Sequence, residues 1–212
     1  MADGARREPS WRVLLLGGSS GTGKSTLAPQ LARHFDVPWL EADDFRLAMQ
    51  RATTPATHPA LHFFLSADMV IRQDFWRLSP EEFRDGLISV GEVVSHALEL
   101  VVRNHVAQGR PMVLEGDGIL PAMAALRLFA GLEVGDAVRA VFLVESDSGA
   151  LLLNMRARSL DGATPNPALR NYARASWLYG LWVGDQAFRH GLPVLEARPY
   201  ETLLSRTLLT LA

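Results

Sequence analysis

The stretch that most constrains the fold lies near the start of the chain, in residues 14–28, LLLGGSSGTGKSTLA. An apolar run ends in a glycine-rich turn of the form G-x-x-x-x-G-K-S/T, and residues with helical spacing follow it. Glycines allow successive backbone N–H groups to converge on phosphate oxygens, and the N-terminus of the next helix adds a favourable dipole. The pattern therefore predicts a strand, a phosphate-binding loop and a helix, in that order.

The motif predicts a role for each of its residues. We expect a nucleoside triphosphate to be bound by Gly18, Ser20, Gly21, Thr22, Gly23, Lys24, Ser25 and Thr26. Within this set, Lys24 is expected to reach the β- and γ-phosphates and Ser25 to ligate Mg²⁺. Lys24 is also the only lysine among the 21 lysines and arginines of the chain. Because an ammonium and a guanidinium are not equivalent at a tight phosphate site, this placement indicates that position 24 requires an ammonium.

Composition and charge are those of an ordinary globular protein. The 212 residues are 48% hydrophobic and 21% charged, enough for one domain with a substantial core over residues 1–212. A formal net charge of −2 gives no support for a nucleic-acid or membrane partner, since such proteins usually carry a basic excess. Residues 1–10 are polar, lack the apolar core of a signal peptide and are expected to be flexible. We therefore expect a cytoplasmic protein whose oligomeric state the sequence leaves open.

Apolar strands and amphipathic helices alternate along the rest of the chain. Buried strands are predicted at 12–18, 37–45, 110–118, 137–146 and 192–198. Helices are predicted at 24–35, at 79–108, from the end of the fourth strand to 155, at 169–190 and in the last residues of the chain, and Gly91 is a candidate break in the helix at 79–108. The helix at 79 has a strong start, because Ser79 can cap it, Pro80 suits its first position and Glu82 completes a capping box. This alternation predicts an α/β fold with a five-stranded parallel sheet flanked by helices.

Acidic residues follow three of these strands. They are Asp43 and Asp44, then Glu115 and Asp117, then Glu145 and Asp147. In open α/β sheets ligands bind at the carboxyl ends of the strands. The first pair could supply a general base for a substrate hydroxyl, and the second could order Mg²⁺ through water. Acids at strand ends also cap the next helix, which is the expectation for Asp147.

Three segments together resemble the P-loop small-molecule kinases: GGSSGTGKSTLA, EADDFR after the second strand and VLEGDGILP after the third. The similarity is above all to 2-phosphoglycerate kinases, and more distantly to zeta-toxin-type and chloramphenicol-phosphotransferase-type kinases. It implies a nucleoside-monophosphate-kinase-like fold with a helical acceptor-binding region at 46–109 and a lid at 155–176. It also implies ATP and Mg²⁺ as cofactors and a small molecule with a hydroxyl as the phosphoryl acceptor, which in 2-phosphoglycerate kinases is 2-phosphoglycerate.

The resemblance also implies site residues. Such kinases carry an Asp followed three residues later by Arg or Lys after the second strand, which makes Asp43 the expected base and Asp44 its neighbour. The expected acceptor-binding set is Asp43, Asp44, Arg46, Arg72, Glu115 and Asp117, and the expected Mg²⁺ ligands are Ser25, Asp43 and Glu115. Several aromatic residues between 46 and 76 would suit an uncharged alcohol, whereas the two arginines would suit an anionic one.

Arginines near the loop at 161–168 complete the expected site. Arg156 and Arg158 precede this loop, and Arg170 and Arg174 follow it at i,i+4 spacing. The resemblance implies that a lid brings arginines to the transferring phosphoryl group, whose developing charge guanidinium groups stabilise. Arg156 and Arg158 are the first candidates for this role.

Two other functions remain alternatives at this point. An antibiotic- or nucleotide-sugar-modifying kinase would use the same parts with a different acceptor. A nucleotide-hydrolysing switch would need no acceptor, but the guanine-binding N-K-x-D motif of GTPases is excluded because the chain has no lysine besides Lys24. The leading hypothesis is therefore an ATP-dependent phosphotransferase.

Overall fold

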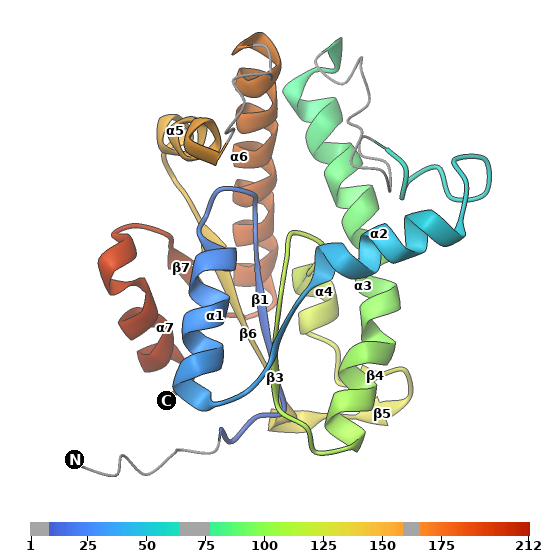
Figure 1. Cartoon of the computed structure of the whole chain (residues 1–212), viewed down its shortest axis with the longest axis vertical. Coiled ribbons are helices and arrows are strands. Elements are labelled where there is room, and N and C mark those ends of the chain that lie inside the picture. Colours follow the sequence, from blue (N-terminus) through green and yellow to red (C-terminus); the bar gives the residue numbers. More distant parts are fainter. Residues whose placement is uncertain (1–8, 64–76, 159–165) are drawn as a thin grey trace.

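A five-stranded parallel sheet forms the centre of the computed structural model, which describes residues 9–63, 77–158 and 166–212 (Figure 1). The strands are β1 (Val13–Gly18), β2 (Trp39–Glu41), β3 (Met112–Glu115), β6 (Val138–Val144) and β7 (Val194–Glu196), in the order β2-β3-β1-β6-β7. All four pairings are parallel, which confirms the predicted sheet. The strands therefore end at one common edge, where acidic residues at and after the ends of β2 and β3 are brought together.

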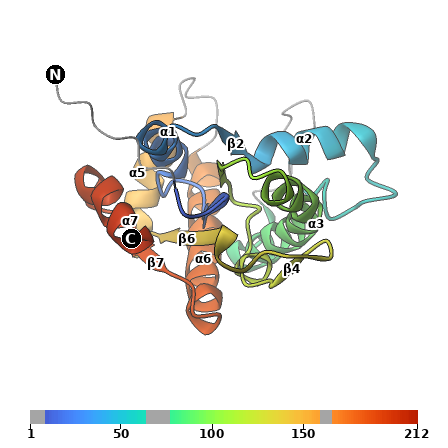
Figure 2. The ribbon, with the colours of Figure 1, turned by 90° about the horizontal axis from the view of Figure 1, so that it is seen from below.

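Helices cover both faces of this sheet (Figure 2). They are α1 (Lys24–Phe35), α2 (Ala42–Ala52), α3 (Pro80–Ala107), α4 (Pro121–Ala124), α5 (Ser148–Arg158), α6 (Asn166–Arg189) and α7 (Leu203–Leu211). Alternate side chains of β1 face opposite layers: Leu14 and Leu16 pack in a core with α1 and α7, and Val13 and Leu15 in a core with α3 and α6. This two-sided burial explains why β1 is a continuous apolar run. No helix of the described residues is long and apolar enough to cross a membrane.

The second strand is shorter than predicted. The sequence predicts a strand over 37–45, but β2 ends at Glu41 and α2 begins at Ala42. Asp43 and Asp44 therefore lie in the first turn of a helix rather than at the end of a strand. Carboxylates in this position interact favourably with the helix dipole, and their side chains project from a rigid turn.

Two further details differ from the sequence-based expectation. A short antiparallel pair, β4 (Leu128–Phe129) and β5 (Leu132–Glu133), lies outside the main sheet and was not predicted. Helix α3 continues through Gly91, where a break was considered. A Cβ on Gly91 would lie 2.8 Å from a side-chain carbon of Leu120, so the glycine lets the helix pack closely against the segment after β3.

The start of α3 confirms the predicted capping box. The Ser79 hydroxyl accepts a hydrogen bond from the Glu82 backbone N–H at 3.1 Å, and the Ser79 N–H donates to the Glu82 carboxylate at 2.8 Å. Hydrogen bonds from the Ser79 backbone N–H and the Ser79 side chain lower the pKa of the Glu82 carboxyl. The two bonds of the capping box satisfy backbone donors that the first turn of a helix otherwise leaves without partners.

We therefore expect Ser79→Ala to lower the free energy of unfolding by about 1 kcal/mol, the usual loss for a serine N-cap. Urea denaturation followed by circular dichroism would measure this change. Glu81→Ala removes a carboxylate from the same turn without removing the cap and serves as the matched control. An equal loss in both variants would show that charge, rather than the cap, stabilises this helix start.

Candidate active site

The phosphate-binding loop, residues 18–25, has a shape that requires glycine. Gly21 and Gly23 both have φ of +89°, and Gly18 has φ of +136°. A Cβ on Gly18 would lie 2.3 Å from the carbonyl oxygen of Leu143, and one on Gly21 would lie 2.6 Å from Leu151. Positive φ and close contacts of this kind disfavour any other residue. The loop is therefore open on the side where backbone amides would bind phosphate.

Lys24 is fixed at the base of this loop. Its side chain is 5% exposed, and its Nζ donates to the Ser19 carbonyl at 2.9 Å and to Asp117 Oδ1 at 2.6 Å. An ammonium has three donors, so one N–H remains for a phosphate oxygen. The structure thus brings Asp117 to Lys24.

Ser25 and Glu115 lie beside Lys24. Glu115 ends β3 and is 3% exposed. Burial raises the pKa of this carboxyl, and the Lys24 ammonium and a hydrogen bond with the Ser25 hydroxyl only partly offset that effect. A hydroxyl and a carboxylate are the hard oxygen ligands that Mg²⁺ takes, so this donor set fits the cation expected from the sequence.

These groups open into one polar pocket, here called the acidic pocket. It is lined by Ser20, Gly21, Gly23, Lys24, Ser25, Glu41, Asp43, Glu115, Gly116 and Asp117. Asp43 therefore lines the pocket although its side chain is 55% exposed, whereas Asp44, also exposed, is not part of the lining. Glu41 was missed in the sequence, although it is the last residue of β2 and pairs in register with Glu115. Its signal in the sequence is its place at the start of EADDFR, two residues before Asp43.

Arg46 lies on α2 three residues after Asp43 and contacts its side chain. It is 7% exposed, and its Nε donates to Asp43 Oδ1 at 3.1 Å. Its buried Nη1 finds no hydrogen-bond partner among the residues that the structure describes. A buried donor without a partner is costly in a folded protein. The guanidinium therefore orients Asp43 and retains one unused donor.

Two tyrosines of α6 reach the same region and were not singled out in the sequence. Tyr179 donates from its hydroxyl to the Asp117 carbonyl. Burial and the Asp117 carboxylate raise the pKa of Tyr172 to about 12, partly offset by a hydrogen bond with Ser20. The two tyrosines are seven residues apart, which places them on one face of the helix. That spacing is a signal in the sequence that could have identified them.

A second pocket adjoins the acidic pocket along the phosphate-binding loop. This adjoining pocket is lined by Gly21, Gly23, Thr26, Leu27, Gln30, Asn154, Ala157, Tyr200 and Leu203 and has a volume of about 800 Å³ including its open mouth. Gly21 and Gly23 belong to both pockets. A ligand that occupied both pockets would therefore pass over Gly21 and Gly23. Its polar part would lie at Lys24, and its less polar part would lie against Leu27 and Leu203.

None of the described arginines predicted for the lid lines either pocket. The side chains of Arg72 and Arg158 lie outside the described residues. Arg156 is exposed on α5 and lines neither pocket. The Arg174 guanidinium lies 4.4 Å from the centre of the Trp177 ring, and its residue is exposed. The expected role of Arg156 and Arg158 in the lid stays a prediction.

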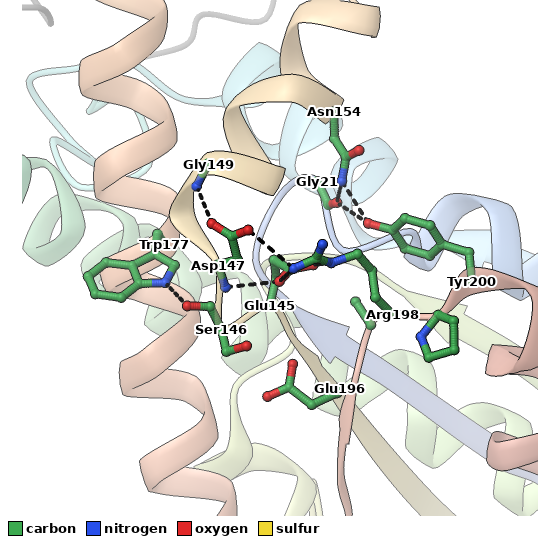
Figure 3. A network of polar contacts seen from close by, with 12 residues as sticks. Gly21, Glu145, Ser146, Asp147, Gly149, Asn154, Trp177, Glu196, Arg198 and Tyr200 are labelled. Carbon is green, nitrogen blue, oxygen red and sulfur yellow. Dashed lines mark hydrogen bonds and ion pairs between the residues drawn. The ribbon is translucent and has the colours of Figure 1, made fainter.

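The third acidic cluster forms a polar network at the ends of β6 and β7 (Figure 3). Arg198 donates to both oxygens of buried Glu145 at 2.7 and 2.8 Å, and its Nη2 lies 3.4 Å from Asp147. Asp147 accepts from the Gly149 N–H at 2.8 Å, so it caps the start of α5 as expected. This cluster therefore joins strand ends and lines neither pocket.

The structural comparisons identify this architecture. A gluconokinase from Sinorhizobium meliloti superposes with a TM-score of 0.50 and 16% identity, over 97% of this chain and 93% of that one. A shikimate kinase from Bacteroides thetaiotaomicron gives 0.51 and 16%, over 95% and 98%. The fold is that of the P-loop kinases.

Sequence comparisons find similarity to 2-phosphoglycerate kinases. A 2-phosphoglycerate kinase of Methanocaldococcus jannaschii is 24% identical over 188 residues, which are 87% of this chain and 58% of the relative. A 2-phosphoglycerate kinase of Methanococcus maripaludis is 28% identical over 118 residues, or 52% and 37%. The chain thus spans less than two thirds of the length of the curated relatives it matches. No protein-family model matches it.

The raised pKa of Glu115 gives a test of the site. The folded protein binds this proton more tightly than the unfolded chain, so the stability that it contributes is lost as pH rises through the raised pKa. We therefore expect Glu115→Gln to raise the melting temperature of the ligand-free protein at neutral pH. The gain should vanish below about pH 4, where both states are protonated.

Exposed Glu133→Gln is the matched control and should not show this pattern. The same Glu115→Gln variant should weaken Mg²⁺-dependent ADP binding about tenfold or more in calorimetry, because it removes a proposed cation ligand. A variant destabilised at neutral pH, or one with unchanged nucleotide binding, would contradict this account of Glu115.

Proposed function

We propose that the chain is an ATP- and Mg²⁺-dependent phosphotransferase that moves the γ-phosphoryl group of ATP to a hydroxyl of a small molecule in the cytoplasm. The observation that carries the proposal is the acidic pocket, in which Lys24, Ser25, Asp43 and Glu115 converge from α1, α2 and β3. The P-loop kinase fold and the printed names of the sequence relatives support it.

The nucleotide half of the reaction uses the phosphate-binding loop. Backbone amides of residues 20–25 bind the phosphates, and the free N–H of Lys24 adds a charge-assisted bond to them. Ser25 and Glu115 hold Mg²⁺, with Asp43 as a further expected ligand. When bound, this ion neutralises charge on the phosphate oxygens. The adjoining pocket takes the nucleoside.

The acceptor half depends on Asp43. Its carboxylate takes the proton of the acceptor hydroxyl as the acceptor oxygen forms a bond to the γ-phosphorus. The bond between that phosphorus and the β–γ bridging oxygen breaks, and ADP leaves with the bridging oxygen. Arg46 orients Asp43 through the Nε contact. Lid arginines, Arg156 and Arg158 first, stabilise the charge on the transferring group.

The acceptor that we propose first is a small hydroxy acid or its phosphate ester, of the 2-phosphoglycerate type. The unused Nη1 of buried Arg46 supports it, because a guanidinium suits carboxylate and phosphate oxygens. An uncharged polyol, as in sugar- or antibiotic-modifying kinases, is the second candidate. The carboxylates of Glu41 and Asp117 in the same pocket favour it, since they repel anions.

A screen of ATP consumption against hydroxy acids, phosphorylated acids, sugars and antibiotic alcohols tests the proposal. We expect ADP release that depends on one acceptor class and is lost in Lys24→Met. Asp43→Asn should lower kcat by roughly 10²- to 10⁴-fold, as for loss of a general base. Asp44→Asn, the exposed neighbour on the same turn, is the matched control and should stay close to wild type. Equal hydrolysis with and without every acceptor would instead support a nucleotide switch.

The choice between acceptor classes depends on Arg46. We expect Arg46→Met to raise KM for an anionic acceptor roughly 10- to 100-fold, the range for a lost charged hydrogen bond. KM for an uncharged acceptor should change much less. Exposed Arg51→Met, on the last turn of the same helix, is the control. An equal effect on both acceptor classes would mean that Arg46 serves only to orient Asp43.

A further inference from the structure

Asn154 on α5 occupies a defined place in the adjoining pocket. Its Nδ2 donates to the Gly21 carbonyl at 2.9 Å and to the Tyr200 hydroxyl at 2.7 Å. Gly21 belongs to the phosphate-binding loop, and Tyr200 follows β7. The amide nitrogen is thus held by two segments that are more than a hundred residues apart in the sequence.

These contacts fix which way the Asn154 amide faces. A backbone carbonyl oxygen only accepts hydrogen bonds, so the group that faces Gly21 must be the nitrogen. A flipped amide would bring two oxygens together and lose that bond. Both N–H groups of Asn154 are therefore used within the protein, and the side chain can offer a ligand only its oxygen.

The oxygen of Asn154 has no donor among the residues that the structure describes. Figure 3 shows Oδ1 directed away from Gly21 and Tyr200, on the far side of the amide from both contacts. Asn154 also lines the adjoining pocket together with Leu27, Gln30 and Leu203. An unpaired acceptor with a fixed orientation at the rim of a largely apolar pocket selects a ligand that carries an N–H donor.

We propose that Asn154 determines the purine specificity of this site: its fixed Oδ1 accepts from the amino group at C6 of adenine and repels the carbonyl at C6 of hypoxanthine or guanine. The inference rests on the proposed nucleotide binding and adds the residue that reads the base. A site whose acceptor cannot turn into a donor discriminates strongly, because the wrong base leaves two acceptors facing each other.

Binding of ADP and IDP by isothermal titration calorimetry, with Mg²⁺ and no acceptor, tests this inference. The two ligands differ only in the group at C6 and the proton on the adjacent ring nitrogen. We expect the wild-type protein to bind ADP roughly 10- to 100-fold more tightly than IDP. In Asn154→Leu, which keeps the branched shape of the side chain and removes the acceptor, the ratio should fall close to one.

Two variants separate this role from its alternatives. Tyr200→Phe removes the hydroxyl that contacts Asn154 but leaves the Gly21 carbonyl, so the ADP/IDP ratio should persist. Gln30→Leu removes the other amide that lines the pocket and should also preserve the ratio. A ratio lost in Gln30→Leu and kept in Asn154→Leu would overturn the inference.

Binding of ADP and IDP by the wild-type protein does not depend on whether a variant folds. It also separates the proposed role of Asn154 from the proposed phosphotransferase activity. Equal binding of ADP and IDP would overturn the role of Asn154 and leave the proposed phosphotransferase intact. Binding of neither ligand would overturn both. Thermal melts of each variant check that a changed ratio does not come from unfolding.

Discussion

The ion pair between Lys24 and Asp117 connects the two halves of the site. It ties the first residue of α1 to the segment after β3, and Tyr179 of α6 holds the same segment through the Asp117 carbonyl. A lysine so fully buried is tolerated only when it is paired and hydrogen-bonded. Its partners here are the loop carbonyl of Ser19 and the Asp117 carboxylate. Loop, strand end and α6 are therefore held in one arrangement before any ligand binds.

The same arrangement concentrates negative charge. Glu41, Asp43, Glu115 and Asp117 all line the acidic pocket, and Lys24 is the one cation among its described lining residues. Burial opposes ionisation of Glu115, so the site is electrostatically unfavourable without a bound cation. Proteins keep such clusters where function requires them, at the expense of stability. This excess of negative charge in a partly buried pocket is the physical basis for regarding the pocket as a site for a cation and phosphates.

Features of the fold that depend on residues close together in the sequence were predictable. Features that depend on contacts between residues far apart in the sequence were less predictable. The capping box at Ser79 is confirmed because its bonds lie within four residues. The five-stranded parallel sheet is confirmed, and its central strands β1, β3 and β6 were predictable because two-sided burial produces continuous apolar runs. The end of β2 was predicted wrongly, since a three-residue edge strand leaves little periodicity and its length is set by pairing with β3.

The sequence by itself determined the glycine-rich loop between β1 and α1, because its positive φ angles and the helix start at Lys24 are encoded by adjacent residues. It also pointed to Asp43 through its spacing to Arg46. Only the tertiary structure decided that Asp117 meets Lys24 and that the Asn154 amide is fixed by Gly21 and Tyr200. These contacts join residues 93, 133 and 46 positions apart. No local pattern records such distances, because they arise from the order in which strands and helices pack.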